Sequence, residues 1–246
     1  IILVAMGAGA AGCLNMWYEA DLDALMSRTC LRPIPTGKIN KKQALIFGVF
    51  LSVFSVSALY YFTNLLSAFL LLFTILFYLF VYTIWLKRKT SQNIVIGGIA
   101  GSLPPVIGWA ISTNSISLAS VSLFLIIFFW TPSHFWALSL YKANDYRKAK
   151  IPMMPITDGT EKTKTYILIY SLLMLPVVVL PYLINFSGLI YLLPVLLLTF
   201  YYNFVCFDLY KFAKNKFDPK KAKKVFGYSI LYLFLIFVLF LIDKIL

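Results

Sequence analysis

Long apolar segments separated by short polar stretches run along the whole chain. Each segment has about the 20 residues that an α-helix needs to cross a hydrocarbon core of about 30 Å. The pattern predicts an all-α polytopic membrane fold, a single transmembrane domain over residues 1–246 with eight spanning helices. These are expected near residues 1–18, 44–62, 66–86, 94–111, 118–140, 166–185, 188–208 and 225–242.

The connections between these segments alternate between short uncharged ones and long basic ones. Lys and Arg number five in residues 19–43, three in 87–93, six in 141–165 and seven in 209–224, which is 21 of the 22 in the chain. Only Lys244 falls on the other side. Basic loops stay in the cytoplasm, so we expect the charged face to be cytoplasmic. A bacterial inner membrane, or a mitochondrial inner membrane in a eukaryote, would accommodate such a protein.

Composition supports this interpretation and excludes a water-soluble domain. The chain is 61% hydrophobic and 13% charged, against the roughly 25% charged residues of soluble domains. Its net charge of +13 would also fit nucleic acid, but the basic residues flank helices at the membrane surface, where lipid head groups and anionic substrates are the better partners. The three scattered cysteines predict neither a disulfide framework nor a zinc site.

The chain begins at Ile1, inside an apolar run and without an initiator Met. We therefore expect that at least one upstream helix of a longer protein is missing.

Acidic residues crowd at the cytoplasmic end of the first segment. Asn15, Glu19 and Asp23 follow one another at steps of four, which places them on one face if the helix continues. An amide and two carboxylates supply the hard oxygen ligands that Mg²⁺ prefers, and Mg²⁺ commonly bridges to substrate phosphates. The alternative is a solvated helix end whose carboxylates pair with nearby bases.

Basic residues come next in the sequence and could bind a diphosphate. A guanidinium matches two phosphate oxygens at once, so Arg28 and Arg32, with Lys38, are candidate diphosphate ligands.

A second polar cluster is expected after the fifth segment. Asp145 is a candidate for a second Mg²⁺, and Lys142 and Arg147 are candidates to neutralise the leaving diphosphate. His134, the one histidine, follows Pro132, which should bend its helix. An intramembrane histidine is a candidate ligand for haem or substrate, and the alternative is a plain structural hydrogen bond to the backbone.

Several motifs together resemble the UbiA-type intramembrane prenyltransferases, and more narrowly their haem-specific branch, the protoheme IX farnesyltransferases or haem o synthases. The motifs are the run from Asn15 to Asp23 with Arg28 and Arg32-Pro33, the stretch from Tyr82 to Trp109, and the segment from Trp130 to Met154.

This resemblance implies a nine-helix protein that transfers the farnesyl group of farnesyl diphosphate to a vinyl group of haem b, giving haem o and diphosphate with Mg²⁺ as cofactor. Haem a synthase or a terminal oxidase would be possible partners. The resemblance assigns metal binding and catalysis to Asn15, Glu19, Asp23 and Asp145, and adds Lys87 and Arg88 to the diphosphate ligands. Two positions depart from the broader superfamily: Glu19 replaces the usual Asp, and Ala149 replaces a second acid.

Two alternatives remain open from the sequence. One is a prenyltransferase of the same fold that modifies a quinone precursor or a lipid. The other is a transporter or binding protein for an anionic lipid, which would use the basic loops without chemistry.

Overall fold

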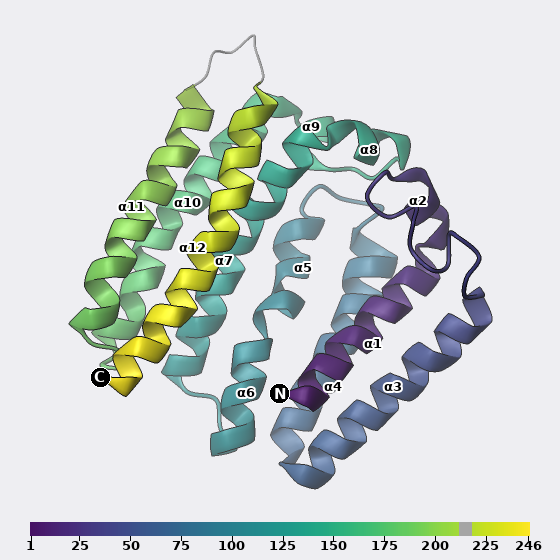
Figure 1. The fold of residues 1–246 in the computed structure, drawn as a ribbon, viewed down its shortest axis with the longest axis horizontal. Coiled ribbons are helices and arrows are strands. Elements are labelled where there is room, and N and C mark those ends of the chain that lie inside the picture. Colours follow the sequence, from purple (N-terminus) through teal and green to yellow (C-terminus); the bar gives the residue numbers. More distant parts are fainter. Residues whose placement is uncertain (212–217) are drawn as a thin grey trace. The chain divides into compact units, whose positions relative to one another are not determined.

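The computed structural model describes residues 1–211 and 218–246, and these residues are helical with no strand among them (Figure 1). The elements in chain order are α1 (Ile2–Tyr18), α2 (Ala20–Leu25), α3 (Lys41–Phe62), α4 (Leu65–Leu76), the π-helix η1 (Phe77–Leu86), α5 (Asn93–Ser102), α6 (Pro104–Thr113), α7 (Leu118–Tyr141), α8 (Ala143–Lys148), α9 (Met154–Thr157), α10 (Gly159–Leu183), α11 (Leu189–Lys211) and α12 (Pro219–Ile245).

All eight predicted spans are helical. Among the described residues, seven helices are long and apolar enough to cross a membrane, with α4 and η1 forming one and α5 and α6 another. The eighth, α1, is apolar and has 17 residues. The prediction of an all-α, multi-pass membrane protein is confirmed.

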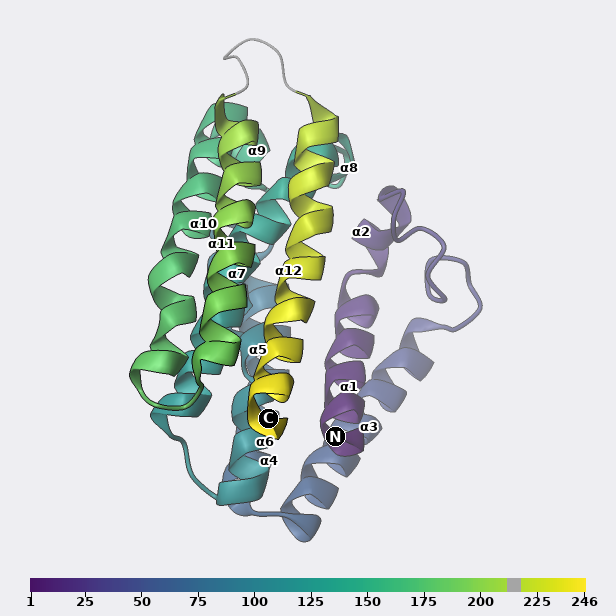
Figure 2. The ribbon, with the colours of Figure 1, turned by 60° about the vertical axis from the view of Figure 1, so that its left-hand side comes forward.

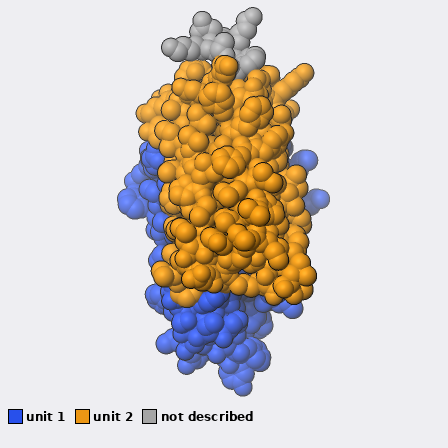
Figure 3. Space-filling model, turned by 90° about the vertical axis from the view of Figure 1, so that its left-hand side faces the viewer, with its two compact units in different colours: residues 1–116, 144–152 blue, residues 117–143, 153–246 orange. Residues whose placement is uncertain are grey.

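The helices form two compact units, which Figure 3 colours separately. Unit 1 contains residues 1–116 and 144–152, and unit 2 contains residues 117–143 and 153–246. A single transmembrane domain over the whole chain stays a prediction.

In unit 1, α1 packs against α3, α4 and η1, while α5 packs on η1 and α6 on α4. Glycines permit two of these contacts. A Cβ on Gly7 would lie 2.6 Å from Leu71, and one on Gly48 would lie 2.8 Å from Leu14. Without a hydrophobic driving force between helices in lipid, such close backbone approach contributes much of the packing energy.

In unit 2, α7, α10, α11 and α12 form a four-helix bundle in which each helix packs against two neighbours (Figure 2). Buried hydroxyls are paired inside it: Tyr202 with Ser133 at 2.7 Å, and Tyr232 with Thr199 at 2.8 Å. Inside a membrane such groups have no water to bond with, so internal partners are required.

Several helices begin earlier than hydropathy predicts. The span expected at 166–185 belongs to α10, which starts at Gly159, and the span expected at 225–242 belongs to α12, which starts at Pro219. The added turns carry exposed lysines such as Lys162 and Lys220, because a helix can continue into the head-group region where charged side chains are solvated. Part of the basic loop 209–224, including Lys214 and Lys216, lies outside the described residues.

Two irregularities distinguish neighbouring spans. The span over residues 93–113 is interrupted at the junction between α5 and α6, where Pro104 is the first residue of α6. The π-helix η1 was not predicted, since no residue type in Phe77–Leu86 marks it. Pro132 lies inside α7, which continues through it.

Candidate active site

The first acidic motif lies where α1 passes into α2. Helical hydrogen bonding continues through the junction at Glu19, because Glu19 N donates to Asn15 O at 2.9 Å and Asp23 N donates to Glu19 O at 2.8 Å. The Asn15 side chain also donates from Nδ2 to Glu19 Oε2 at 2.8 Å. The spacing of four therefore stacks the three side chains in successive turns of unit 1.

These three side chains are buried. Asn15 is 6% exposed, Glu19 is 1% exposed and Asp23 is 4% exposed. The helix end is therefore not solvated at these three positions, although the pairing with basic residues that this alternative also expected does occur at Glu19 and Asp23. Buried carboxylates require compensating charges or a cation.

Basic residues from the predicted set compensate both buried acids. Lys87 Nζ forms an ion pair with Glu19 Oε2, and Arg32 Nη1 lies 2.8 Å from Asp23 Oδ2. Thr29 further fixes the turn by donating to the backbone oxygen of Asp23 at 3.0 Å.

A third ion pair, between Arg88 and Asp21 at 3.1 Å, is largely exposed. Burial raises the pKa of Asp21, but the hydrogen bond and charge of Arg88 outweigh it and lower the pKa overall.

The π-helix η1 supplies two contacts to this motif. Thr83 accepts a hydrogen bond from Asn15 Nδ2 at 3.1 Å, and Lys87 pairs with Glu19, so residues four apart on η1 meet residues four apart on α1. A turn of a π-helix is wider than a turn of an α-helix, and the Thr83 hydroxyl accordingly donates to Tyr78 O, five residues earlier, at 2.9 Å.

One oxygen of Glu19 is available for a ligand. Glu19 Oε1 is buried and has no hydrogen-bond partner among the described residues. Asn15 uses its amide nitrogen for both Glu19 and Thr83, so its Oδ1 lies outside these two bonds. A buried carboxylate oxygen with no partner among the described residues is the kind of hard oxygen donor that Mg²⁺ prefers.

This donor set is small. No cluster of three His, Cys, Asp or Glu side chains that could hold a metal occurs in the described part of the chain. A cation at this motif would therefore complete its coordination with water or substrate oxygens, as Mg²⁺ commonly does.

The second acidic residue contacts the loop that follows the first motif. Ser27, four residues after Asp23, donates from Oγ to Asp145 Oδ2 at 2.5 Å. This contact joins positions 118 residues apart in the sequence. Ala149, where the broader superfamily has an acid, is buried.

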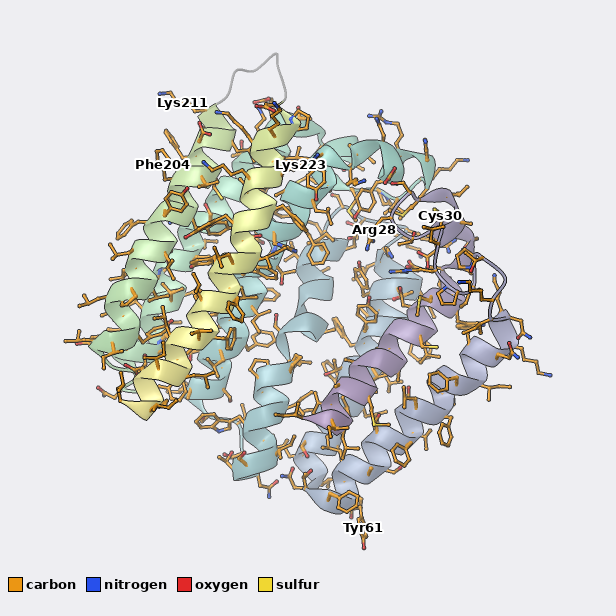
Figure 4. The ribbon with its side chains drawn as sticks, in the orientation of Figure 1. Arg28, Cys30, Tyr61, Phe204, Lys211 and Lys223 are labelled. Carbon is orange, nitrogen blue, oxygen red and sulfur yellow. The ribbon has the colours of Figure 1, made fainter. Side chains whose placement is uncertain are left out.

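The remaining predicted diphosphate ligands lie at different places. Arg28 is exposed at the α2 end of unit 1 (Figure 4), and Arg147 is exposed on α8, where it donates to Asn144 Oδ1 at 3.3 Å. Lys142 follows the last residue of α7, in unit 2.

Lys38 forms no ion pair with the acidic motif among the described residues, and its role as a diphosphate ligand stays a prediction. It lines a groove of about 380 Å³ between α1 and α3, together with Cys13 and Phe47.

His134 lies inside unit 2 in an aromatic stack. Its ring stacks between Trp130, at 4.2 Å between centroids, and Phe226, at 4.5 Å. Its Nδ1 lies 2.7 Å from Ser229 Oγ, and Trp130 Nε1 donates to Ser229 O at 2.8 Å. Because both faces and Nδ1 are engaged, a ligand would have to approach His134 through Nε2.

Sequence reasoning missed Thr83, Ser27 and Ser229. Each is a small hydroxyl residue to which the sequence assigned no role, and each gains its role only from a partner far away in the sequence. Thr83 lies inside the quoted stretch from Tyr82 to Trp109 and Ser27 lies next to Arg28, which is the one signal that could have drawn attention to them.

Several known proteins are similar to this chain in sequence or fold. The family model "UbiA prenyltransferase family" matches residues 1–230. A protein of Pelagibacter ubique named "Protoheme IX farnesyltransferase" is 75% identical over all 246 residues and 81% of its own length.

Two solved structures share the fold. A digeranylgeranylglyceryl phosphate synthase is 19% identical with a TM-score of 0.79, over 98% of this chain and 84% of that one. A UbiA homolog from Archaeoglobus fulgidus bound to DMAPP and Mg²⁺ is 16% identical with a TM-score of 0.63, over 97% of this chain and 85% of that one. With its motif of amide and carboxylates and a family match over nearly its whole length, the chain belongs to the UbiA prenyltransferase family.

Proposed function

We propose that this protein transfers the farnesyl group of farnesyl diphosphate to a vinyl group of haem b, producing haem o and diphosphate. The observation that carries the donor half is the buried Glu19, which pairs with Lys87 through one oxygen, while its other oxygen has no hydrogen-bond partner among the described residues. The acceptor half is supported by the relative at 75% identity, which is named protoheme IX farnesyltransferase.

The acidic motif and its bases would bind the diphosphate together. Asn15, Glu19 and Asp23 would hold Mg²⁺, and Asp145 would hold a second ion. Support comes from the related structure solved with DMAPP and Mg²⁺. When bound, Mg²⁺ neutralises charge on the diphosphate oxygens.

The basic residues would neutralise the remaining charge as it grows on the leaving group. Lys87 and Arg32 are already held beside the carboxylates, and an anion entering there would meet both cations. Arginine suits this task because its planar fork contacts two phosphate oxygens at once. The same role is proposed for the other cations, Arg28, Arg88, Lys142 and Arg147.

The reaction then breaks the bond between farnesyl C1 and the diphosphate oxygen, whose electron pair leaves with diphosphate. The vinyl π-electrons of haem b form the new carbon–carbon bond to C1. Water adds to the resulting carbocation beside the porphyrin and loses a proton, which gives the hydroxyethylfarnesyl side chain. The protein's contribution is to position these groups and to stabilise developing negative charge.

His134 is the proposed haem contact. Trp130 and Phe226 fix the plane of its ring, and Ser229 fixes one nitrogen, so Nε2 has a defined direction. A histidine oriented in this way by a hydrogen bond is how proteins commonly present an imidazole to a metal.

The basic loops are proposed to face the cytoplasm, or the matrix in a mitochondrion. Support comes from the uneven distribution of Lys and Arg among the loops. Both polar motifs lie on the same set of loops, so both substrates would be bound from that side.

The proposal can be tested on membranes that contain the full-length protein. Haem b, farnesyl diphosphate and Mg²⁺ are added, and the extracted haems are identified by mass spectrometry. We expect haem o to appear, and to disappear when Mg²⁺ is chelated and return when it is restored.

The alternatives give different products. If haem b stays unchanged and a prenylated quinone precursor or lipid appears, that molecule and not haem b is the acceptor. Unchanged haem b and intact farnesyl diphosphate, with folded protein, would favour a lipid transporter. An Asp23→Asn variant that retains full turnover would remove the metal assignment.

A further inference from the structure

Unit 1 contains a groove apart from the acidic motif. It lies between the C-terminal half of α1 and the start of α3 and has a volume of about 380 Å³. Its walls are mainly apolar, with Lys38 at one end; they include Cys13, Met16, Ile39, Ala44 and Phe47. The volume falls within the range typical of small-ligand sites.

This groove is separate from the acidic motif. Successive residues of an α-helix point about 100° apart, so Met16 cannot share a direction with Asn15. Asn15 and Glu19 contact η1, whereas Cys13 donates to the backbone oxygen of Ala44 on α3 at 3.3 Å. A molecule in the groove would therefore lie on a different face of α1 from the proposed diphosphate site.

Three lysines lie in or next to the sequence that forms one end of the groove: Lys38 lines it, and Lys41 and Lys42 begin α3 directly before the lining residues Gln43 and Ala44. Lys38, Lys41 and Lys42 are all exposed, and no ion pair joins any of them to an acid in residues 1–211 or 218–246. The first turn of α3 adds the partial positive charge of a helix N-terminus. The rim is thus cationic and uncompensated.

The depth of the groove matches the boundary between head groups and acyl chains. Cys13 precedes the last residue of α1 by five positions and Phe47 follows the first residue of α3 by six, which at 1.5 Å per residue is about 8 to 9 Å for each. The apolar wall is open to the surroundings, because Ile39 is 41% exposed and Phe47 is 57% exposed.

We propose that this groove binds one anionic phospholipid, with an acyl chain along α1 and α3 and the phosphate head group held by Lys38, Lys41 and Lys42. An apolar channel beneath three unpaired cations fits a lipid that is negatively charged at one end. A zwitterionic lipid would fill the channel but gain less from the cations. This inference does not depend on the reaction proposed above.

Cys13 offers a direct measure of occupancy, because it lines the groove and is partly exposed. The whole protein is placed in nanodiscs of phosphatidylcholine, with or without phosphatidylglycerol, and treated with N-ethylmaleimide. Alkylation is then read peptide by peptide. Cys30, also partly exposed but in the loop beside Ser27, is the internal reference.

We expect phosphatidylglycerol to slow alkylation of Cys13 several-fold and to leave Cys30 unchanged. Lys38→Gln should weaken retention of phosphatidylglycerol in native mass spectrometry about fivefold, since one basic residue near an anionic lipid surface contributes about 1 kcal/mol. The triple variant Lys38→Gln, Lys41→Gln, Lys42→Gln should lose the protection of Cys13 altogether.

A matched variant removes the same charge elsewhere: Lys220→Gln, Lys223→Gln, Lys224→Gln on α12. This variant should keep the protection of Cys13 and the retention of phosphatidylglycerol. If it loses both as the Lys38, Lys41 and Lys42 variant does, the lipid is attracted to the basic surface in general and not bound in the groove. Equal protection by phosphatidylcholine alone would also overturn the proposal. Protection by farnesyl diphosphate in place of phosphatidylglycerol would assign the groove to the prenyl donor.

Discussion

Lys87 at the end of η1 forms an ion pair with Glu19 at the end of α1, and the Glu19 side chain is 1% exposed. Removing one member of a buried pair leaves the other charged, buried and uncompensated. Lys87→Met should therefore lower the free energy of unfolding by about 3 to 5 kcal/mol. Thermal unfolding in detergent would measure the loss.

The double variant Glu19→Gln, Lys87→Met supplies the control, because it removes both charges. It should recover most of the stability lost in Lys87→Met. Arg88→Met, which breaks the exposed pair with Asp21, should cost only about 0 to 1 kcal/mol. If Lys87→Met is as stable as Arg88→Met, the buried pair does not have the energetic role assigned to it.

Glu19→Gln should reduce turnover about 10²- to 10³-fold. The amide keeps the size of the side chain but offers a cation a neutral oxygen, and the proposed metal would be held less firmly. Initial rates of haem o formation over a range of Mg²⁺ concentrations would measure this, with a shift to higher Mg²⁺ as the specific sign.

Asp21→Asn is the matched control for that change. Asp21 lies two residues from Glu19 on the exposed side of α2 and pairs only with Arg88 among the ion pairs of the described residues. Its turnover and Mg²⁺ dependence should stay close to those of the unmodified protein. Similar losses in both variants would mean that the burial of Glu19 is irrelevant to its role.

Ser27→Ala should reduce kcat about tenfold by removing the hydroxyl that donates to Asp145 at 2.5 Å. A hydrogen bond to a charged group contributes about 1.5 to 3 kcal/mol, and the loss of kcat should not exceed the factor that corresponds to this energy. Ser27→Thr keeps the hydroxyl and should restore most of the rate. Absence of rescue by threonine, with both variants folded, would show that packing at this position matters and the hydrogen bond does not.

Gly97→Ala should destabilise the protein by about 1 to 3 kcal/mol through overpacking. A Cβ at Gly97 would lie 2.2 Å from the ring of Tyr82, the η1 residue next to Thr83. Gly101→Ala in the same helix is the control, since its Cβ would meet no atom within 4 Å. Equal melting temperatures for the two variants would contradict the close contact between α5 and η1.

His134→Ala should abolish the absorbance change that accompanies haem b binding. Ser229→Ala leaves the imidazole present but removes the hydroxyl that lies 2.7 Å from Nδ1. Loss of such an orienting partner typically weakens metal binding about 10- to 100-fold, and we expect an effect of that size. If the haem titration is unchanged in His134→Ala, His134 does not bind haem and only packs in the aromatic stack.

The sequence by itself determined the number of spans, the placement of the charged loops and the motif of Asn15, Glu19 and Asp23. These follow from local rules: about 20 apolar residues cross a membrane, and residues four apart share a helix face. The short connection at Glu19 preserved the predicted face because helical hydrogen bonds continue through it.

Only the tertiary structure decided which partners these residues meet. Thr83 and Lys87 reach Asn15 and Glu19 from η1, and Ser27 reaches Asp145 across 118 positions. Lys38, grouped with the diphosphate ligands by its position in the loop, lines a groove on another side of α1. Spacing fixes directions within one helix, whereas the pairing of faces between helices depends on packing that no local pattern encodes.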